Sequence, residues 1–161
     1  MEAAVPIPAH ADAAAYAPLL CAGVTVFNSM RRMNVQPGSL VAIQGLGGLG
    51  HLAIQYAHKM GYRVVALSGS GAKEKFALEL GADEYLDASK GDLAEGLQRL
   101  GGAAMVVCTA PNLKIIGGLV DGLEPQGKLL ILSRESRLFR LYSDLGLLRD
   151  WLMLCCRCSC G

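Results

Sequence analysis

Residues 43–57, IQGLGGLGHLAIQYA, place regularly spaced glycines between an apolar run and a stretch with helical periodicity. The apolar run, Ser39–Gly45, is bounded by turn signals and predicts a buried strand. From Gly48 the apolar residues recur at helical spacing as far as Gly61, which predicts a helix. A strand, a glycine-rich loop and a helix therefore follow one another, and a helix that begins in this way can bind a phosphate group.

The chain repeats this alternation as far as Leu132. Further strands are predicted at 62–68, 84–87, 104–110 and 128–132, and further helices at 72–80, 92–100 and 113–123. Each helix must bury its apolar face against the strands that it joins, so this alternation predicts parallel crossover connections. The expected fold class is α/β, with a doubly wound, Rossmann-type parallel sheet of five strands covered on both faces.

The pattern divides the chain into three parts. Residues 1–38 are expected to form a linker and a leading helix at Ala22–Met33, and residues 39–133 the dinucleotide-binding domain. Residues 134–161 contain no turn signal and no sixth strand. Apolar residues at helical spacing nevertheless predict an amphipathic helix there, followed by a cysteine cluster: Leu138, Leu141, Leu145, Leu148, Leu152 and Cys155.

Composition limits the class of protein. Apolar residues make up 52% of the 161 residues, which is typical of a globular chain and not of a disordered one. A net charge of +1 gives no basic surface for nucleic acid or an anionic membrane. Pro18 interrupts the apolar stretch Ala13–Phe27, so neither a signal peptide nor a membrane span is expected, and the expected compartment is the cytoplasm.

The glycines have the spacing G-x-G-x-x-G. In this pattern Gly45 makes the tight turn out of the strand, Gly47 lets the backbone approach a diphosphate, and Gly50 allows close packing of helix on strand. The free amides of the first helical turn, at Gly48 and Leu49, would attract the diphosphate. The alternative is a purely structural turn.

The end of the second strand normally selects the cofactor. An acidic residue about 20 residues beyond the loop accepts hydrogen bonds from the ribose of NAD and repels the 2′-phosphate of NADP. This chain has Ser68 there, followed by Ser70 and Lys73, which favours NADP over NAD. The alternative is that Ser70 only caps the next helix and that Lys73 is solvated.

Three stretches carry a resemblance to a known family. PLLCAGVTVF (18–27), GLGGLGHLAIQYAHKMG (45–61) and GAKEKFALELGAD (71–83) resemble the zinc-dependent alcohol dehydrogenases of the medium-chain dehydrogenase/reductase superfamily, and the likeness extends over Val5–Leu132. The resemblance implies hydride transfer between a small-molecule alcohol or aldehyde and NADP(H) or NAD(H). It also implies that Cys21 is a ligand of a catalytic zinc, that Thr25 lies near the nicotinamide and that Thr109 contacts the cofactor.

The family's two other zinc ligands, a cysteine and a histidine, belong to an N-terminal catalytic domain that would precede Met1. A catalytic zinc needs three protein ligands, so we expect no catalytic residue in this chain and no zinc held by it alone. Cys21 is then expected to be a small buried side chain at a helix start.

The family continues beyond its fifth strand with a sixth, which residues 134–161 do not match. A truncated gene product is therefore expected, with self-association through an exposed strand edge or the leucine face. Zinc or palmitate on Cys155, Cys156, Cys158 and Cys160 is the sharper alternative for the tail. For the whole chain, the alternative to an oxidoreductase is a catalytically inactive dinucleotide-binding remnant or interaction module.

Overall fold

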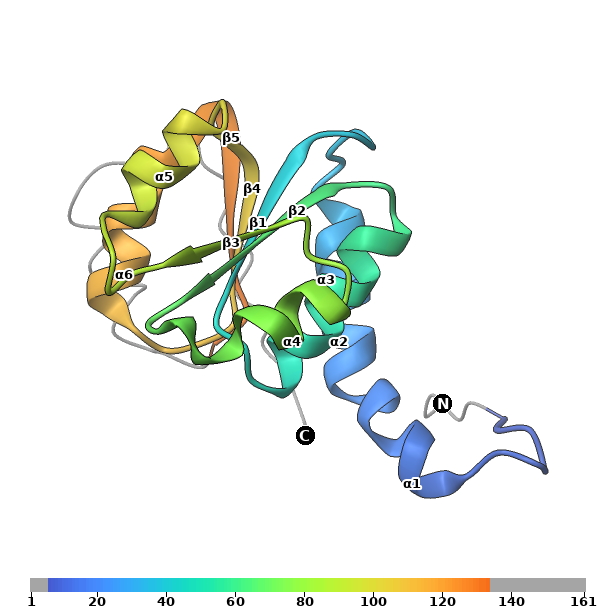
Figure 1. The fold of residues 1–161 in the computed structure, drawn as a ribbon. Coiled ribbons are helices and arrows are strands. Elements are labelled where there is room, and N and C mark those ends of the chain that lie inside the picture. Colours follow the sequence, from blue (N-terminus) through green and yellow to red (C-terminus); the bar gives the residue numbers. More distant parts are fainter. Residues whose placement is uncertain (1–5, 134–161) are drawn as a thin grey trace.

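The computed structural model describes residues 6–133, which form a parallel sheet with helices on both faces (Figure 1). The sheet has five strands in the order β3-β2-β1-β4-β5, and every neighbouring pair is parallel. The strands are β1 Leu40–Gln44, β2 Arg63–Ser68, β3 Glu84–Asp87, β4 Ala103–Cys108 and β5 Leu123–Ile131. The predicted doubly wound α/β fold is therefore confirmed.

The helices alternate with the strands as the sequence pattern predicts. They are α1 Ala13–Tyr16, α2 Ala22–Arg32, α3 Gly48–Lys59, α4 Glu74–Glu79, α5 Leu93–Arg99 and α6 Leu113–Gly118, with 3₁₀ turns η1 Ala17–Leu20, η2 Gly71–Lys73 and η3 Leu119–Gly122. In Figure 1, α2, α3 and α4 lie on one side of the sheet, and α5 and α6 lie on the other.

Alternate residues of the buried strands point to opposite faces of the sheet and pack into two separate apolar cores. On one face Ile43 and Val107 pack with Ile54 of α3 and Met30 of α2. On the other face Leu67 and Val106 pack with residues of α5 and α6, namely Leu97 and Ile116. All residues of β1 and β4 are buried, because helices cover both faces of a parallel sheet.

The order of the strands sets where a ligand can bind. The chain runs from β1 outward through β2 to β3, and then crosses to β4 on the opposite side of β1. The connections from β1 and β4 therefore diverge to opposite faces of the sheet. In open α/β sheets, the carboxyl ends of two such strands border the crevice that binds ligands.

The fifth strand differs from the prediction. The sequence predicted a helix over 113–123 and a strand from 128, whereas helical structure ends at Gly122 and β5 already begins at Leu123. The register runs from Ala103↔Leu123 to Met105↔Lys128, so residues 124–127 bulge opposite a single residue of β4. Pro125 lies in this bulge, where its missing amide hydrogen breaks no ladder hydrogen bond.

The leading helix extends further toward the N-terminus than predicted. Helical segments follow one another from Ala13 to Arg32, and Pro18 lies in the first turn of η1, a position that tolerates proline. By length and composition alone, this 20-residue stretch is apolar enough to cross a membrane. Core helices of soluble proteins and signal sequences meet the same criterion, so the expectation of no membrane span stays a prediction.

Two expectations concern residues that the structure does not describe. The amphipathic tail helix with its cysteine cluster, and the missing sixth strand, lie at 134–161, outside the described range.

The bulge in β5 depends on a buried glycine. A Cβ atom at Gly127 would lie 2.7 Å from the Ala103 carbonyl oxygen, which is backbone and cannot move aside. We expect Gly127→Ala to lower the free energy of unfolding by about 2 kcal/mol, measured by urea denaturation. Gly117→Ala, in α6 with open space around the position, is the control and should raise stability by about 0.5–1 kcal/mol. Equal stabilities for the two variants would contradict the packing role of Gly127.

Candidate functional site

The glycine loop joins β1 to α3 at the carboxyl edge of the sheet, where the connections from β1 and β4 diverge. Gly45 has a φ of +91°, and a Cβ atom there would lie 2.6 Å from the Ala110 Cβ. A Cβ atom at Gly50 would lie 1.8 Å from the Gly45 carbonyl oxygen. Both positions therefore need glycine, the first for the turn and the second for the contact of α3 with the loop.

The other loop glycines face open space. A Cβ atom at Gly47 or Gly48 would meet nothing within 4 Å, and both residues are exposed. Gly47 is the N-cap of α3 and supplies no side chain to the first-turn amides, while its carbonyl accepts the first helical hydrogen bond from the His51 amide. The backbone donors and the positive dipole end of the helix N-terminus are thus exposed at the surface.

Polar groups at the ends of β1 and β4 hold the loop in place. The Thr109 amide and hydroxyl both donate to the Gln44 carbonyl at 2.9 Å, and the hydroxyl also lies 3.0 Å from the Gly45 carbonyl oxygen. The buried Gln44 side chain accepts a hydrogen bond from the Ala110 amide at 3.2 Å. Thr109, predicted as a cofactor contact, is therefore at the loop, but its hydroxyl hydrogen is directed to loop carbonyls.

Residues beyond β2 approach the same loop. Ser68 is the half-buried last residue of β2, and Ser70 follows it on the surface. Ser70 occupies the N-cap position of η2, as the alternative expects, but its side chain makes no capping hydrogen bond there. Lys73 instead extends back to the loop, where its ammonium donates to the Leu46 carbonyl at 3.1 Å.

Sequence reasoning missed a carboxylate beside this segment. Asp87, the last residue of β3, is in register with Ser68 of β2. The Ser89 hydroxyl and amide donate to its Oδ1 at 2.7 and 2.8 Å and lower its pKa, and Lys90 and the Gly71 amide lower that pKa further. Asp87 stands 19 residues after Ser68 in the chain, so only the pairing of the strands brings the two together.

The predicted metal ligand, Cys21, lies on the surface. Cys21 is exposed and forms the N-cap of α2, so the expectation of a buried side chain is wrong. The buried residues of α2 come after it in the chain, beginning at Gly23 and Val26. Within residues 6–133 there is no group of three or more His, Cys, Asp or Glu that could hold a metal ion. Thr25, predicted near the nicotinamide, is half-buried on α2.

A second thiol in the described part of the chain lies in the core. Cys108, the last residue of β4, is fully buried, and this burial raises its pKa to about 12. The thiol therefore stays protonated at neutral pH and is not a nucleophile.

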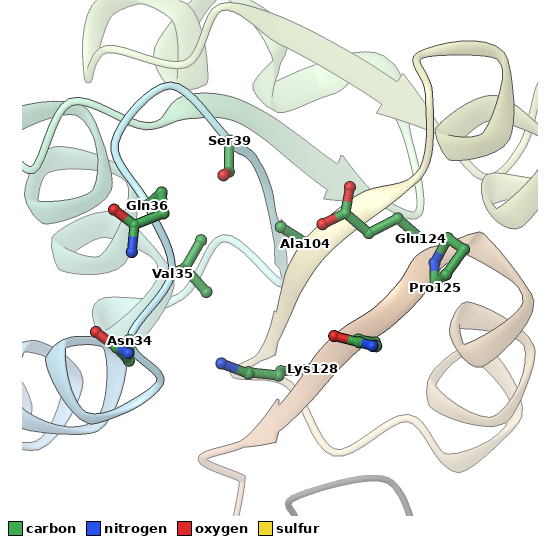
Figure 2. Close-up of a pocket in the computed structure, with 9 residues that line it drawn as sticks. Asn34, Val35, Gln36, Ser39, Ala104, Glu124, Pro125 and Lys128 are labelled. Carbon is green, nitrogen blue, oxygen red and sulfur yellow. The ribbon is translucent and has the colours of Figure 1, made fainter.

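A pocket of about 720 Å³ opens at the opposite, amino edge of the sheet (Figure 2). Its walls are the α2–β1 loop and the first half of β5, where the Lys128 ammonium donates to the Met33 carbonyl. Asn34 and Gln126, which line it, have φ values of +50° and +66°. Asn34 follows the C-terminus of α2 and Gln126 lies in the bulge of β5, so these conformations follow from the architecture of this edge.

Comparison with known proteins assigns the family. The zinc-binding dehydrogenase family matches residues 48–138. Alcohol dehydrogenase patD of Penicillium expansum is 65% identical over 132 residues, which are 82% of this chain and 39% of that protein. Alcohol dehydrogenase notN of Aspergillus sp. (strain MF297-2) is 59% identical over 144 residues, which are 89% of this chain and 42% of that protein.

Solved structures agree with this assignment. The alcohol dehydrogenase of the hyperthermophilic archaeon Aeropyrum pernix superposes with a TM-score of 0.72 at 27% identity, covering 87% of this chain and 44% of that one. The chain spans 39% and 42% of the length of the two curated relatives. Because the family match extends over more than half of its 161 residues, the chain belongs to the zinc-binding dehydrogenase family.

Proposed function

We propose that this chain is the dinucleotide-binding part of an oxidoreductase that transfers hydride between a small alcohol or aldehyde and NADP(H), with NAD(H) as second choice. The observation that carries the proposal is the β1–loop–α3 unit. Its tight glycines, Gly45 and Gly50, form the turn, and its open ones, Gly47 and Gly48, leave the helix N-terminus free. The names of the relatives, which are alcohol dehydrogenases, support the class of substrate.

The residues of the loop fit the cofactor. Amides of the first turn of α3 would hold the diphosphate, and the open space at Gly47 and Gly48 would admit it against the backbone. The adenosine ribose would lie at the carboxyl end of β2, beside Ser68. When bound, the nicotinamide supplies the hydride acceptor or donor, while the protein supplies binding and orientation.

Two residues support NADP(H) as first choice. Ser68 places a hydroxyl where NAD-binding proteins have a carboxylate, so β2 itself carries no charge that repels a 2′-phosphate. Lys73, which follows β2 in the chain, places its ammonium group against the glycine loop, at the Leu46 carbonyl. Its attraction for a phosphate would add to that of the helix N-terminus.

The zinc implied by the family does not fit the described residues. Cys21 is exposed, and residues 6–133 contain no group of three potential ligands around it or elsewhere. A catalytic zinc requires three protein ligands and an open position. This observation favours a second candidate function for the 161-residue chain by itself, that of a dinucleotide-binding module without turnover.

Cofactor binding can be tested by fluorescence titration of the full chain with NADPH and NADH. We expect saturable binding, with NADPH the tighter ligand. Gly47→Leu should weaken both by roughly tenfold or more, because the new side chain would fill the space of the diphosphate. Gly117→Leu, which also faces open space but on α6, should leave both affinities unchanged. Saturable binding that Gly47→Leu does not weaken would contradict the assignment of the loop.

Turnover and assembly can be measured together. For the 161-residue chain we expect no oxidation or reduction in a panel of alcohols and aldehydes followed at the NADPH absorbance, because Cys21 lacks two further ligands in the described residues. Light scattering should show self-association, since Leu20, Val24 and Phe27 are exposed on the helical segments before β1. Turnover by a monodisperse sample with one zinc per chain would contradict both expectations.

A further inference from the structure

The carboxyl ends of β2 and β3 place a carboxylate beside the position that selects the cofactor. Ser68 and Asp87 are partners in the parallel register, and each is the last residue of its strand. Neighbouring strands lie about 4.8 Å apart, and the side chains of paired residues point to the same face of a sheet. A carboxylate is therefore present at this edge, one strand away from its usual location on β2.

The two oxygens of Asp87 have different surroundings. Oδ1 accepts the hydrogen bonds from Ser89, which fix the orientation of the carboxylate. Oδ2 points toward the segment after β2, because a Cβ atom at Gly71 would lie 3.2 Å from it. Oδ1 is thus held by the turn at Ser89, and Oδ2 lies beside the Gly71 backbone, in the segment that would contact the adenosine ribose.

That segment is itself held in place from both sides. The Tyr85 hydroxyl, on β3, donates to the Ser70 carbonyl at 2.5 Å. Lys73 is tied to the glycine loop through the Leu46 carbonyl. A negative charge at Asp87 and a positive charge at Lys73 therefore flank residues 70–72 in a defined arrangement.

We propose that Asp87 determines cofactor specificity at this site: its Oδ2 accepts hydrogen bonds from the adenosine ribose hydroxyls and its negative charge opposes a 2′-phosphate. The proposal rests on the proposed dinucleotide function and refines it. Lys73 favours the phosphorylated ribose and Asp87 disfavours it, so the balance of the two charges sets the preference between NADP(H) and NAD(H).

The chemistry of Asp87 supports this role. Hydrogen bonds from Ser89 lower its pKa, so the carboxylate is ionised at neutral pH. Lys90 lies on the same side of the segment, with its ammonium 3.9 Å from the position of a Gly71 Cβ atom. With Asp87 neutralised, Lys90 would be free to attract a phosphate there.

The test uses four probes on the full chain: NADH, NADPH, 5′-AMP and adenosine 2′,5′-bisphosphate. The last two isolate the ribose subsite from the nicotinamide. Asp87→Asn keeps an oxygen that can accept from Ser89 but removes the charge, so we expect the fold to be retained. The ratio of the dissociation constants should then move about tenfold toward the 2′-phosphorylated member of each pair. Lys73→Met should move both ratios in the opposite direction.

Asp121→Asn is the matched control, because Asp121 is an exposed carboxylate in η3, at the amino edge of the sheet. It should leave both ratios unchanged. Unchanged ratios in Asp87→Asn, or an equal shift in Asp121→Asn, would overturn the role of Asp87 while leaving dinucleotide binding intact. Failure of the unsubstituted chain to bind any of the four probes would overturn the proposed function and this inference with it.

Discussion

The contact between α3 and the end of β1 is the constraint on which the rest of the structure depends. The Gly50 backbone approaches the Gly45 carbonyl so closely that a Cβ atom would lie 1.8 Å from that oxygen. This approach seats α3 on the sheet, where Ile54 and Ala57 complete one apolar core. The same approach places the N-terminus of α3 at the carboxyl edge, where the connections from β1 and β4 diverge.

The apolar framework and the polar edge have separate roles. The cores on the two faces of the sheet fix the strands in register, and that register determines which polar residues meet at the carboxyl edge. There, Gln44 and Thr109 support the loop from β1 and β4. Asp87 and Lys73 place opposite charges around the segment after β2. Cofactor preference in the proposal is thus a property of neighbouring strands, and not of β2 alone.

The sequence predicted those features that depend on local pattern. The nearly continuous apolar runs of β1 and β4 predicted buried strands. The spacing of the glycines predicted the loop between β1 and α3. The start of β5 at Leu123 was missed because its bulge interrupts the apolar run with Glu124, Pro125 and Gln126.

Features that depend on tertiary pairing could not be predicted in this way. The position of Asp87 beside Ser68 requires the strand register, and the exposure of Cys21 depends on which residues of α2 the packed fold buries. Gln44 is a site residue that the sequence could have indicated, because it is a polar residue at the end of an apolar strand, directly before the glycine loop. Its side chain is buried.

The central claim is that the β1–α3 loop is the dinucleotide site. Hydrogen–deuterium exchange of the full chain, with and without saturating NADPH, tests it most directly. We predict slower exchange at amides 45–51 and around 68–73, with no change at 34–36 and 39, which line the pocket at the opposite edge. Protection confined to residues 34–39 and 124–128, or no protection at the loop under saturation, would contradict the account.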